Sequence, residues 1–526
     1  MKFRRNISYI MILWGCSFLL AACTSNQQEV KETELNYGST KDIRDINPHI
    51  YSGEMAAQNM VFEGLTKNED GQVKPALAQS WDISPDGRVY TFKLRKNVKF
   101  SDGEAFNAQV VKMNMDAIMA NKSRHAWLEL VDEIADTKAI DPDTFQLTLK
   151  EPYYPTLTEL GLTRPFRFIS PNCFIDGGTK DGVKEYIGTG PWVLKEHTRD
   201  QKAVFVRNEN YWGEKPAIET INWKVISDPQ TLVLSLKNGD VDLIYGSDGD
   251  QLSMDTFNRL KTDASFATYV SNPIASRAVL LNSKRPYLND VRVREAIEYA
   301  VNKKEIVEGI LDGTEKEADT LLSKNVPYCD VDLTNYYYNP PKAKQLLEEA
   351  GWKLTDQGTR EKAGETMELV FSYNSQNEQE GTIAQAIQED LKDIGISVKI
   401  LPEEKQLFLD RQKDGDFDLQ YSLSWGTPYD PQSYLSSWRI PAHGDYQAQL
   451  GLAKKQWLDE KISETLVDTD EDKRKEDYQE ILTYINDQCV YLPLSYSRTK
   501  AVASSAVKGV TFNDSQYEIP FEKMSK

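Results

Sequence analysis

The histidines are the first place to look for metal chemistry in this chain. His49, His125, His197 and His443 are its only imidazoles, and they stand far apart in sequence. A transition-metal site built by a protein alone takes about three or four His, Cys or carboxylate ligands, often in close sequence pairs. This spacing therefore argues against such a site, and each histidine taken alone is better explained by packing or surface exposure.

Two arginine-bearing clusters have the right residue types for binding a carboxylate. Ser123 to Glu129 contains Arg124 and Trp127, and Thr163 to Phe168 contains Arg164. Arginine forms bidentate pairs with carboxylates and keeps its charge when partly buried. An arginine beside a tryptophan can also hold a flat or cationic ligand. An internal salt bridge explains each cluster equally well, so both interpretations stay open at this point.

The run Trp425 to Pro431, which continues to Ile440–Asp445, has the composition of a binding loop. It follows a predicted strand over 417–423 and contains large aromatics, prolines, glycines and His443. Exposed aromatics are unfavourable unless something covers them, and loops on rigid scaffolds often hold binding groups. Packing of these aromatics into the nearest core is the alternative.

Motifs for catalysis or for nucleotide binding are missing from the sequence. There is no Gly-x-Ser-x-Gly elbow and no His-Glu-x-x-His helix. The run Gly188–Pro191 lacks the Lys-Ser/Thr that follows in a phosphate-binding loop. The net charge of −19 disfavours nucleic acid and anionic lipid as partners. We therefore expect a protein that is not an enzyme and that has no catalytic cofactor. We also expect it to act as a monomer.

The N-terminus has the pattern of a bacterial lipoprotein. A basic segment precedes an apolar run that is short for a membrane span, and Leu20-Ala21-Ala22-Cys23 reads as a lipobox. We expect a signal peptide over 1–22, and a lipidated Cys23 with a polar tether over 23–33. The protein would then lie outside the cytoplasm and contact the membrane only through its lipid. A signal-anchor helix is the alternative.

The mature chain reads as an α/β protein with more than one domain. Its length of 526 residues is too great for one compact core. Strand and helix patterns alternate, and the polar run near 270–273 suggests a crossing between lobes. We expect lobe I over 34–272, lobe II over 273–495 and a return to lobe I over 496–526. Cys173, Cys329 and Cys489 lack metal or redox spacing, so buried free thiols are expected, with one disulfide as the alternative.

Assembled, these segments resemble the extracellular solute-binding proteins of the peptide/nickel ABC-importer family, known as family 5. The resemblance covers essentially the whole mature chain, with the family signature at 77–103. Within the family, the chain is most similar to the nickel-binding members. The runs that carry this likeness are Arg124–Leu130, Arg164–Phe168, Val206–Pro216 and Trp425–Pro431. The resemblance implies two α/β lobes, an extra subdomain in lobe I and a ligand cleft between the lobes.

The resemblance also implies a ligand and its contacts. The ligand would be nickel wrapped in a small organic chelator, such as free L-histidine, for delivery to an ABC-importer permease. His443 would give the metal one imidazole, and Arg164 would pair with a chelator carboxylate. The residues assigned to the ligand pocket are Met55, Arg124, Trp127, Arg164, Trp425 and Tyr429. Leu409 replaces a pocket tyrosine of the family.

Two other ligands remain open from the sequence. One is an opine-type metallophore that carries nickel, cobalt or zinc. The other is an oligopeptide, but peptide-binding relatives usually have an acidic residue just after the loop tryptophan. Gly426-Thr427-Pro428 stand there in this chain, which disfavours a peptide.

Overall fold

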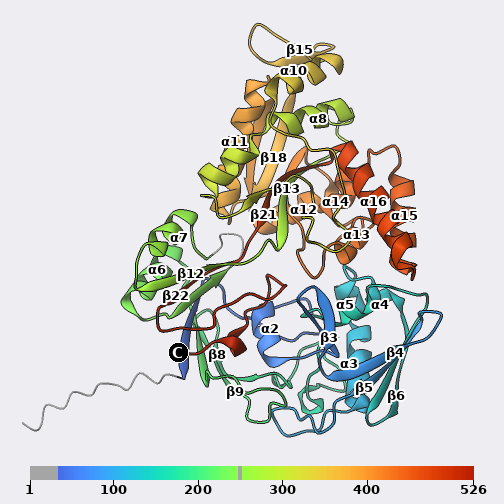
Figure 1. Ribbon diagram of the computed structural model, residues 1–526, viewed down its shortest axis with the longest axis vertical. Helices are drawn as coiled ribbons and strands as arrows, with labels where there is room; N and C mark the ends of the chain where they lie inside the picture. The colour runs from blue at the N-terminus through green and yellow to red at the C-terminus, as the bar shows by residue number, and fades with distance from the viewer. Residues whose placement is uncertain (1–32, 247–250) are drawn as a thin grey trace, which may run out of the picture.

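Two mixed β-sheets, one in each half of the molecule, form the framework of the protein (Figure 1). The computed structural model describes residues 33–246 and 251–526, so the predicted signal peptide and Cys23 lie outside the described residues. We call the lower half lobe I and the upper half lobe II. This arrangement agrees with the α/β, two-lobe expectation.

The sheet of lobe I has seven strands in the order β12-β22-β11-β1-β10-β9-β8. Their bounds are Glu34–Ser39 (β1), Trp192–Thr198 (β8), Lys202–Arg207 (β9), Thr220–Val225 (β10), Leu243–Gly246 (β11), Phe266–Val270 (β12) and Lys500–Ser504 (β22). Helices α2 (Met55–Val61), α6 (Pro229–Asn238) and α7 (Met254–Lys261) accompany it. The sheet is mixed, because β1 pairs in parallel with β10 and β11 while β22 runs antiparallel to its neighbours.

A four-stranded antiparallel sheet forms the extra subdomain of lobe I. Its order is β4-β5-β7-β6, with bounds Ala78–Ile83 (β4), Val89–Leu94 (β5), Ile134–Asp141 (β6) and Thr144–Leu149 (β7). The helical segments here are α3 (Ala108–Ala120), η1 (Lys122–His125), α4 (Leu130–Glu133), α5 (Thr156–Leu160) and η2 (Pro171–Cys173), and a hairpin joins β2 (Thr66–Glu69) to β3 (Gln72–Pro75). Asn107 begins α3 by accepting hydrogen bonds from the amides of Gln109 and Val110.

The sheet of lobe II has six strands in the order β14-β21-β13-β20-β18-β19. Their bounds are Ala275–Leu281 (β13), Lys316–Glu317 (β14), Glu368–Asn374 (β18), Ser397–Glu403 (β19), Leu419–Leu423 (β20) and Tyr491–Ser497 (β21). Alternate residues of β13 enter different cores: Val279 and Leu281 pack in one cluster, and Ala278 and Leu280 in another. A strand covered on both faces needs such a continuous apolar run.

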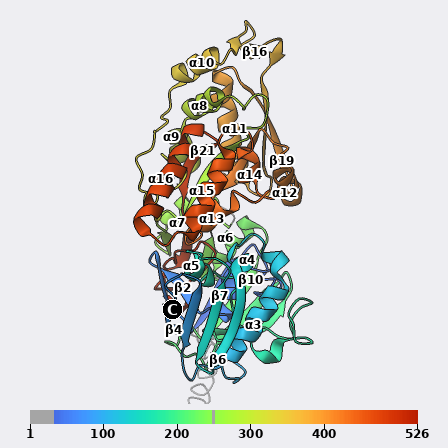
Figure 2. The same ribbon diagram turned by 90° about the vertical axis from the view of Figure 1, so that its right-hand side faces the viewer.

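Helices cover both faces of the lobe II sheet (Figure 2). They are α8 (Val291–Ala300), α9 (Lys303–Glu305), η3 (Ile306–Ile310), α10 (Pro340–Glu349), α11 (Glu378–Asp393), α12 (Lys405–Asp414), α13 (Gln432–Ser437), α14 (Gly444–Gln449), α15 (Lys455–Val467) and α16 (Glu471–Gln488). The short strands β15 (Lys353–Leu354), β16 (Arg360–Lys362) and β17 (Glu365–Thr366) form a separate small sheet, and η4 (Phe521–Lys523) lies near the C-terminus.

Two short segments carry the chain between the lobes. Residues 271–274 join β12 to β13, and residues 498–499 join β21 to β22. The segments run side by side, because the Ser271 amide donates to the Thr499 carbonyl and the Thr499 amide donates to Ser271 Oγ, both at 2.9 Å. The lobes are therefore connected through a hydrogen-bonded double crossing.

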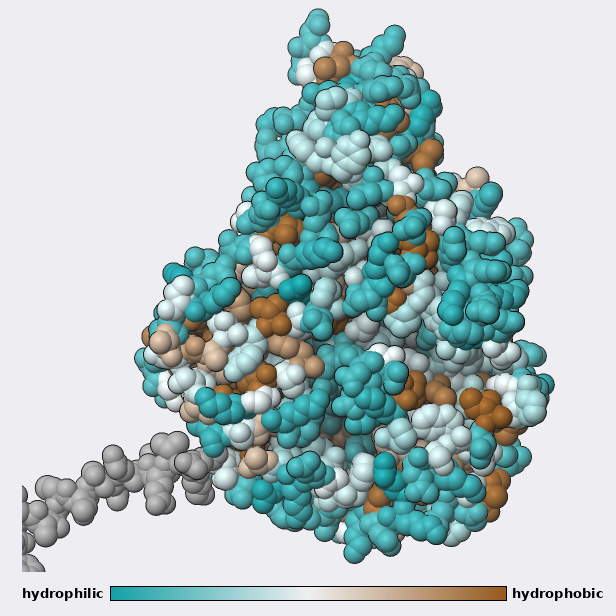
Figure 3. All heavy atoms as spheres, in the orientation of Figure 1, coloured by the Kyte–Doolittle hydropathy of each residue, from teal (hydrophilic) through white to brown (hydrophobic). Residues whose placement is uncertain are grey.

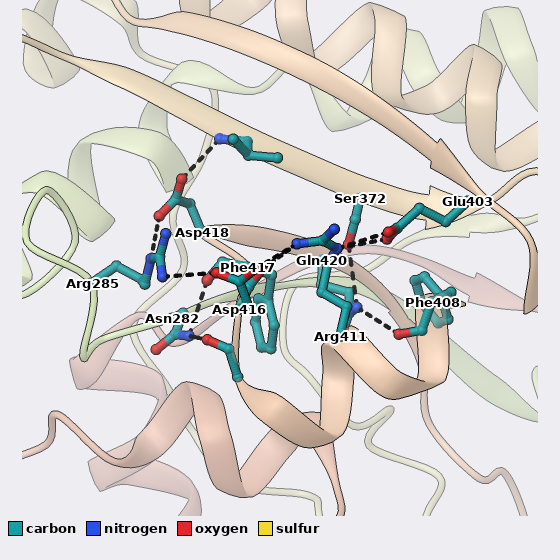
Figure 4. A network of polar contacts seen from close by, with 12 residues as sticks. Asn282, Arg285, Ser372, Glu403, Phe408, Arg411, Asp416, Phe417, Asp418 and Gln420 are labelled. Carbon is teal, nitrogen blue, oxygen red and sulfur yellow. Dashed lines mark hydrogen bonds and ion pairs between the residues drawn. The ribbon is translucent and has the colours of Figure 1, made fainter. Parts of the chain in front are cut away.

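A polar network anchors the start of β20, the strand that leads into Trp425 (Figure 4). Arg285 Nε donates to Asp418 Oδ1 at 2.8 Å, and Arg411 pairs with both Glu403 and Asp416. Asn282 Nδ2 donates to the carbonyls of residues 415 and 417. These bonds fix α12 and the turn between α12 and β20 against the sheet, so the loop after β20 starts from a rigid position.

The visible surface is mostly polar, and the three described cysteines lie inside the protein. The face in Figure 3 is mostly hydrophilic, with hydrophobic residues in small scattered groups. Cys173, Cys329 and Cys489 are buried and unpaired, which confirms the expectation of free thiols. Within 33–246 and 251–526, no helix combines the length and the apolar character needed to cross a membrane.

Candidate functional site

The loop after β20 separates two cavities, and its residues face them in turn. Thr427, Pro428 and Asp430 line a wide groove of 1330 Å³, whereas Trp425 and Tyr429 line a smaller pocket of 170 Å³. The wide groove is larger, but of the predicted binding loop it contains only Thr427, Pro428, Asp430 and Pro431, and none of the residues assigned individually to the ligand or its metal. The smaller pocket is therefore the candidate site.

The small pocket brings together side chains from five separate parts of the sequence. Its lining residues are Tyr51, Met55, Trp127, Arg164, Trp425, Tyr429, His443 and Tyr517. Trp425, Tyr429 and His443 belong to lobe II, and the others belong to lobe I. Sites for drug-sized ligands usually span about 300–1,000 Å³, so this pocket favours a compact ligand.

Hydrogen bonds to both lobes hold the loop in shape. Gly426 has φ of 77°, a left-handed conformation that favours glycine. The buried carboxyl of Asp430 accepts a bond from Ser424 Oγ at 2.6 Å, and burial raises the pKa of Asp430 to about 7. Thr427 Oγ1 donates to the Asp514 carbonyl in lobe I at 2.7 Å. The loop is thus a fixed wall between the cavities.

Aromatic rings meet across the lobe boundary inside the pocket. The ring centroids of Trp127 in lobe I and Trp425 in lobe II are 5.8 Å apart, and those of Trp127 and Tyr429 are 6.4 Å apart. The His443 ring lies 5.7 Å from that of Trp425. The aromatics of the loop therefore face the lobe boundary and line the pocket, although Tyr429 itself is almost fully buried.

Arg164 is buried in the pocket wall and has no carboxylate partner among the described residues. Its side chain is 7% exposed, its Nη1 donates to the Ser52 carbonyl at 2.9 Å, and its guanidinium lies 4.7 Å from the centre of the Tyr51 ring. No ion pair of Arg164 occurs in the part of the chain that the structure describes. The internal salt bridge considered from the sequence is therefore not formed, and the pocket contains a positive charge that an anionic ligand can neutralise.

Two polar groups of the pocket are suited to contact a ligand directly. Trp127 Nε1 is buried and has no hydrogen-bond partner among the described residues, which leaves one unsatisfied donor in a residue of the pocket lining. Burial lowers the pKa of His443, although Asp445 opposes this shift. The His443 imidazole is therefore neutral at neutral pH and can donate a lone pair to a metal.

Two residues implied by the resemblance lie outside the pocket lining. Arg124 is exposed on η1, and Leu409 is 40% exposed on α12. Their long side chains extend into solvent. Met55, Trp127, Arg164, Trp425, Tyr429 and His443 are the predicted residues that the structure does bring together.

Comparison with known proteins identifies the family to which this architecture belongs. Residues 72–446 match the model of the bacterial extracellular solute-binding proteins, family 5. The chain is 43% identical to the nickel-binding periplasmic protein of Escherichia coli strain K12, over 96% of this chain and 97% of that protein. The chain belongs to solute-binding protein family 5. The family supplies ABC importers with their solutes, so the protein works outside the cytoplasm and with a permease.

Solved structures of the family show the same fold. NikA from Brucella suis, in complex with Fe(III)-EDTA, aligns with a TM-score of 0.92 and 45% identity, covering 93% of this chain and 99% of that one. NikZ from Campylobacter jejuni, in complex with Ni(L-His), aligns with a TM-score of 0.80 and 25% identity, covering 94% and 100%. Both are two-lobe binding proteins, as expected from the sequence.

Sequence reasoning missed two tyrosines of the pocket in this family 5 protein. Tyr51 is 60% exposed and contacts both Arg164 and Trp127. Tyr517 comes from the C-terminal return segment and packs edge-on against Tyr429, with ring centroids 5.8 Å apart. For Tyr51, which follows His49 by two residues, the one available signal was that it lies close in sequence to Met55, a predicted pocket residue. Nothing local in the sequence marked Tyr517.

Direct hydrogen bonds close the lobes next to the pocket, where α13 lies against α4 and α5 (Figure 1). Ser433 Oγ in lobe II donates to Glu159 Oε1 in lobe I at 2.9 Å. Ser436 Oγ donates to Glu129 Oε2 at 2.5 Å, and Arg439 pairs with the same carboxylate. Burial raises the pKa of Glu159 to about 8, and the nearby Glu129 charge adds to this rise.

The raised pKa of Glu159 predicts a stability that falls in alkali. Unfolding returns the pKa to its ordinary value of 4.5, so the folded protein holds a proton that the unfolded chain releases. This contribution is complete below 4.5 and is lost as pH rises through about 8. Between pH ~6 and ~9, the unfolding free energy of the wild type should therefore drop by about 2 kcal/mol more than that of Glu159→Gln. Urea unfolding at both pH values measures this difference, and equal drops would contradict it.

Proposed function

We propose that this protein captures nickel already bound to a small organic chelator, such as L-histidine, and delivers the complex to an ABC-importer permease. The observation that carries the proposal is the composition of the pocket: one neutral imidazole, one buried arginine without an ion-pair partner, and no carboxylate among its lining residues. The nickel-binding name of the Escherichia coli relative and the Ni(L-His) ligand of NikZ support it.

The pocket can supply only part of a nickel coordination sphere. No group of three or more His, Cys, Asp or Glu residues in the described part of the chain is placed to hold a metal. Imidazole suits Ni²⁺, and the remaining ligands would have to come with the metal. His443 would thus contribute one ligand, while the chelator contributes the others and sends a carboxylate toward Arg164. Trp127 Nε1 would donate to a second oxygen, and Arg124, which is exposed outside the pocket lining, would be a second and weaker basic contact.

The two alternative ligands fit the pocket less well. A peptide carries an ammonium group that needs an anionic partner, and the pocket lining has no carboxylate. An opine-type metallophore carries several carboxylates, whereas Arg164 is the one arginine among the lining residues. A compact chelate with one free carboxylate matches this single buried charge best.

The remaining features of the proposal concern the location and behaviour of the protein. We propose that acyl chains on Cys23 hold it at the outer face of the cytoplasmic membrane, and that it acts there as a monomer. It would have no enzymatic activity, because the pocket groups are arranged to bind rather than to transform a ligand. Residues 23–33 would then be a tether to the membrane.

Calorimetry separates chelate binding from binding of the free ion. We expect Ni²⁺ with two equivalents of L-histidine to bind tightly and Ni²⁺ alone to bind weakly, because one imidazole gives too few ligands. His443→Ala should weaken chelate binding by at least about tenfold. His197→Ala, at a histidine outside the pocket, is the matched control. Equal affinity for Ni²⁺ with and without histidine would rule out the model.

The two arginines should differ in their effect on affinity. Arg164→Gln removes a buried charge-assisted contact, which should weaken chelate binding by about 10- to 100-fold. Arg124→Gln, at an exposed position, should change affinity by no more than about threefold. Titrations of both variants alongside thermal unfolding test this, since a loss of affinity with an unchanged melting temperature locates the effect in the pocket. Equal effects of the two substitutions would count against the role of Arg164.

Lipid attachment can be tested in cells. Cys23→Ser should move the protein from the membrane fraction to the soluble fraction, because the serine hydroxyl cannot form the thioether to the diacylglyceryl group. Labelling with a radioactive fatty acid should mark the wild type and not the variant. A Cys23→Ser protein that stays in the membrane fraction would show that another segment anchors it.

A further inference from the structure

Two buried histidines lie behind the pocket, and ligand binding as described above does not use them. His49 and His125 are both fully buried. His49 precedes Tyr51 by two residues, and His125 precedes Trp127 by two residues. Both tyrosine and tryptophan line the pocket. The histidines therefore lie on the segments that position the pocket walls.

Hydrogen bonds from these rings join three separate segments of lobe I. His125 Nε2 lies 3.0 Å from the His49 carbonyl oxygen, and His49 Nε2 lies 2.8 Å from the Arg167 carbonyl oxygen. A carbonyl can only accept, so each ring donates through Nε2–H. The bonds connect η1, the segment around residues 47–52 and the segment that contains Arg164.

The second nitrogen of each ring fits the same protonation state. His49 Nδ1 lies 3.2 Å from Thr179 Oγ1, whose hydroxyl can donate to it. His125 Nδ1 is buried and has no partner among the described residues. In the neutral ring, Nδ1 keeps an unpaired lone pair. Protonation of Nδ1 would cost more free energy, because it would add both an N–H without an acceptor and a buried charge. Both rings are thus held neutral with the proton on Nε2, and burial lowers the pKa of His49 to about 4.

We infer that His49 and His125 are positioning residues of the ligand pocket: their Nε2–H donors set the distances between the Tyr51, Trp127 and Arg164 walls. Arg164 itself depends on this arrangement, because its Nη1 donates to the carbonyl of Ser52, three residues after His49. The inference rests on the proposed function only for its effect on chelate affinity. The geometry of the walls can be measured without any ligand.

The choice of variants follows from the donor atoms. Glutamine at either position presents an amide N–H about where Nε2–H stands, so His125→Gln and His49→Gln keep the donor. His125→Met and His49→Met keep the bulk and lose it. His197→Gln is the matched control. His197 lies on β8, its ring nitrogen is 2.8 Å from Asp42 Oδ1, and it does not line the pocket.

The ligand-free test uses NMR on the full-length mature protein. With 5-fluorotryptophan, and with Trp127→Phe to assign the signal, the Trp127 fluorine resonance should shift in His125→Met, return in His125→Gln and stay unchanged in His197→Gln. Nitrogen spectra of the imidazoles should show His49 and His125 neutral with the proton on Nε2 at pH ~6.5. An unmoved Trp127 resonance in His125→Met, or a proton on Nδ1 in either ring, would overturn the inference.

The affinity test uses Ni²⁺ with two equivalents of L-histidine as the probe. Loss of one hydrogen bond behind the pocket should weaken binding by about fivefold or more in each methionine variant, and the glutamine variants should stay within about twofold of wild type. If a methionine variant does not fold, the glutamine variants decide, since a folded glutamine variant with a shifted Trp127 signal contradicts the inference. A wild type that does not bind the chelate would refute the proposed function, while the NMR result would still decide the role of the histidines.

Discussion

The small pocket exists only where the two lobes touch, because each lobe contributes part of its wall. Trp425, Tyr429 and His443 come from lobe II, and Met55, Trp127 and Arg164 come from lobe I. The chain crosses between the lobes through residues 271–274 and 498–499. Contacts between the lobes, such as that of Ser433 with Glu159, therefore determine whether the pocket walls meet.

Electrostatics explain why a ligand would stabilise that contact. Arg164 is buried without an ion-pair partner in the described residues, and its main supports are one carbonyl and the face of the Tyr51 ring. A buried charge that is incompletely compensated is unfavourable. A carboxylate brought in by the ligand would offset this cost in a low-dielectric site, where charge-assisted bonds are strong.

Much of the fold could be predicted from local sequence signals. Asp228, Pro229 and Gly239 mark α6 by capping chemistry, and the apolar run at 278–281 indicates a strand covered on both faces. The site was predicted only in part. The loop of Trp425 and Tyr429 stood out by composition, but the choice between cleft and core depended on which lobe it would face.

The rest of the site could not be read from the sequence because it depends on long-range contacts. Tyr517 reaches the pocket only through the path of the return segment after β22, and no local pattern encodes that path. His49 and His125 looked like isolated packing residues, and only the folded structure shows that His125 bonds to the His49 carbonyl and His49 to the Arg167 carbonyl. Arg124 and Leu409 are exposed outside the pocket lining, so their predicted roles stay predictions.

The division of contacts between the lobes ties ligand capture to closure. In the proposed complex, the metal is bound through His443 in lobe II while the chelator carboxylate is bound through Arg164 in lobe I. A free ion would engage only the first group, and a free chelator only the second. Neither would gain both interactions. A ligand shifts the equilibrium between the open and closed lobes only by the difference between its affinities for these two states. The intact chelate is the species that bridges both lobes, so it is the species that would favour the closed form presented to the permease.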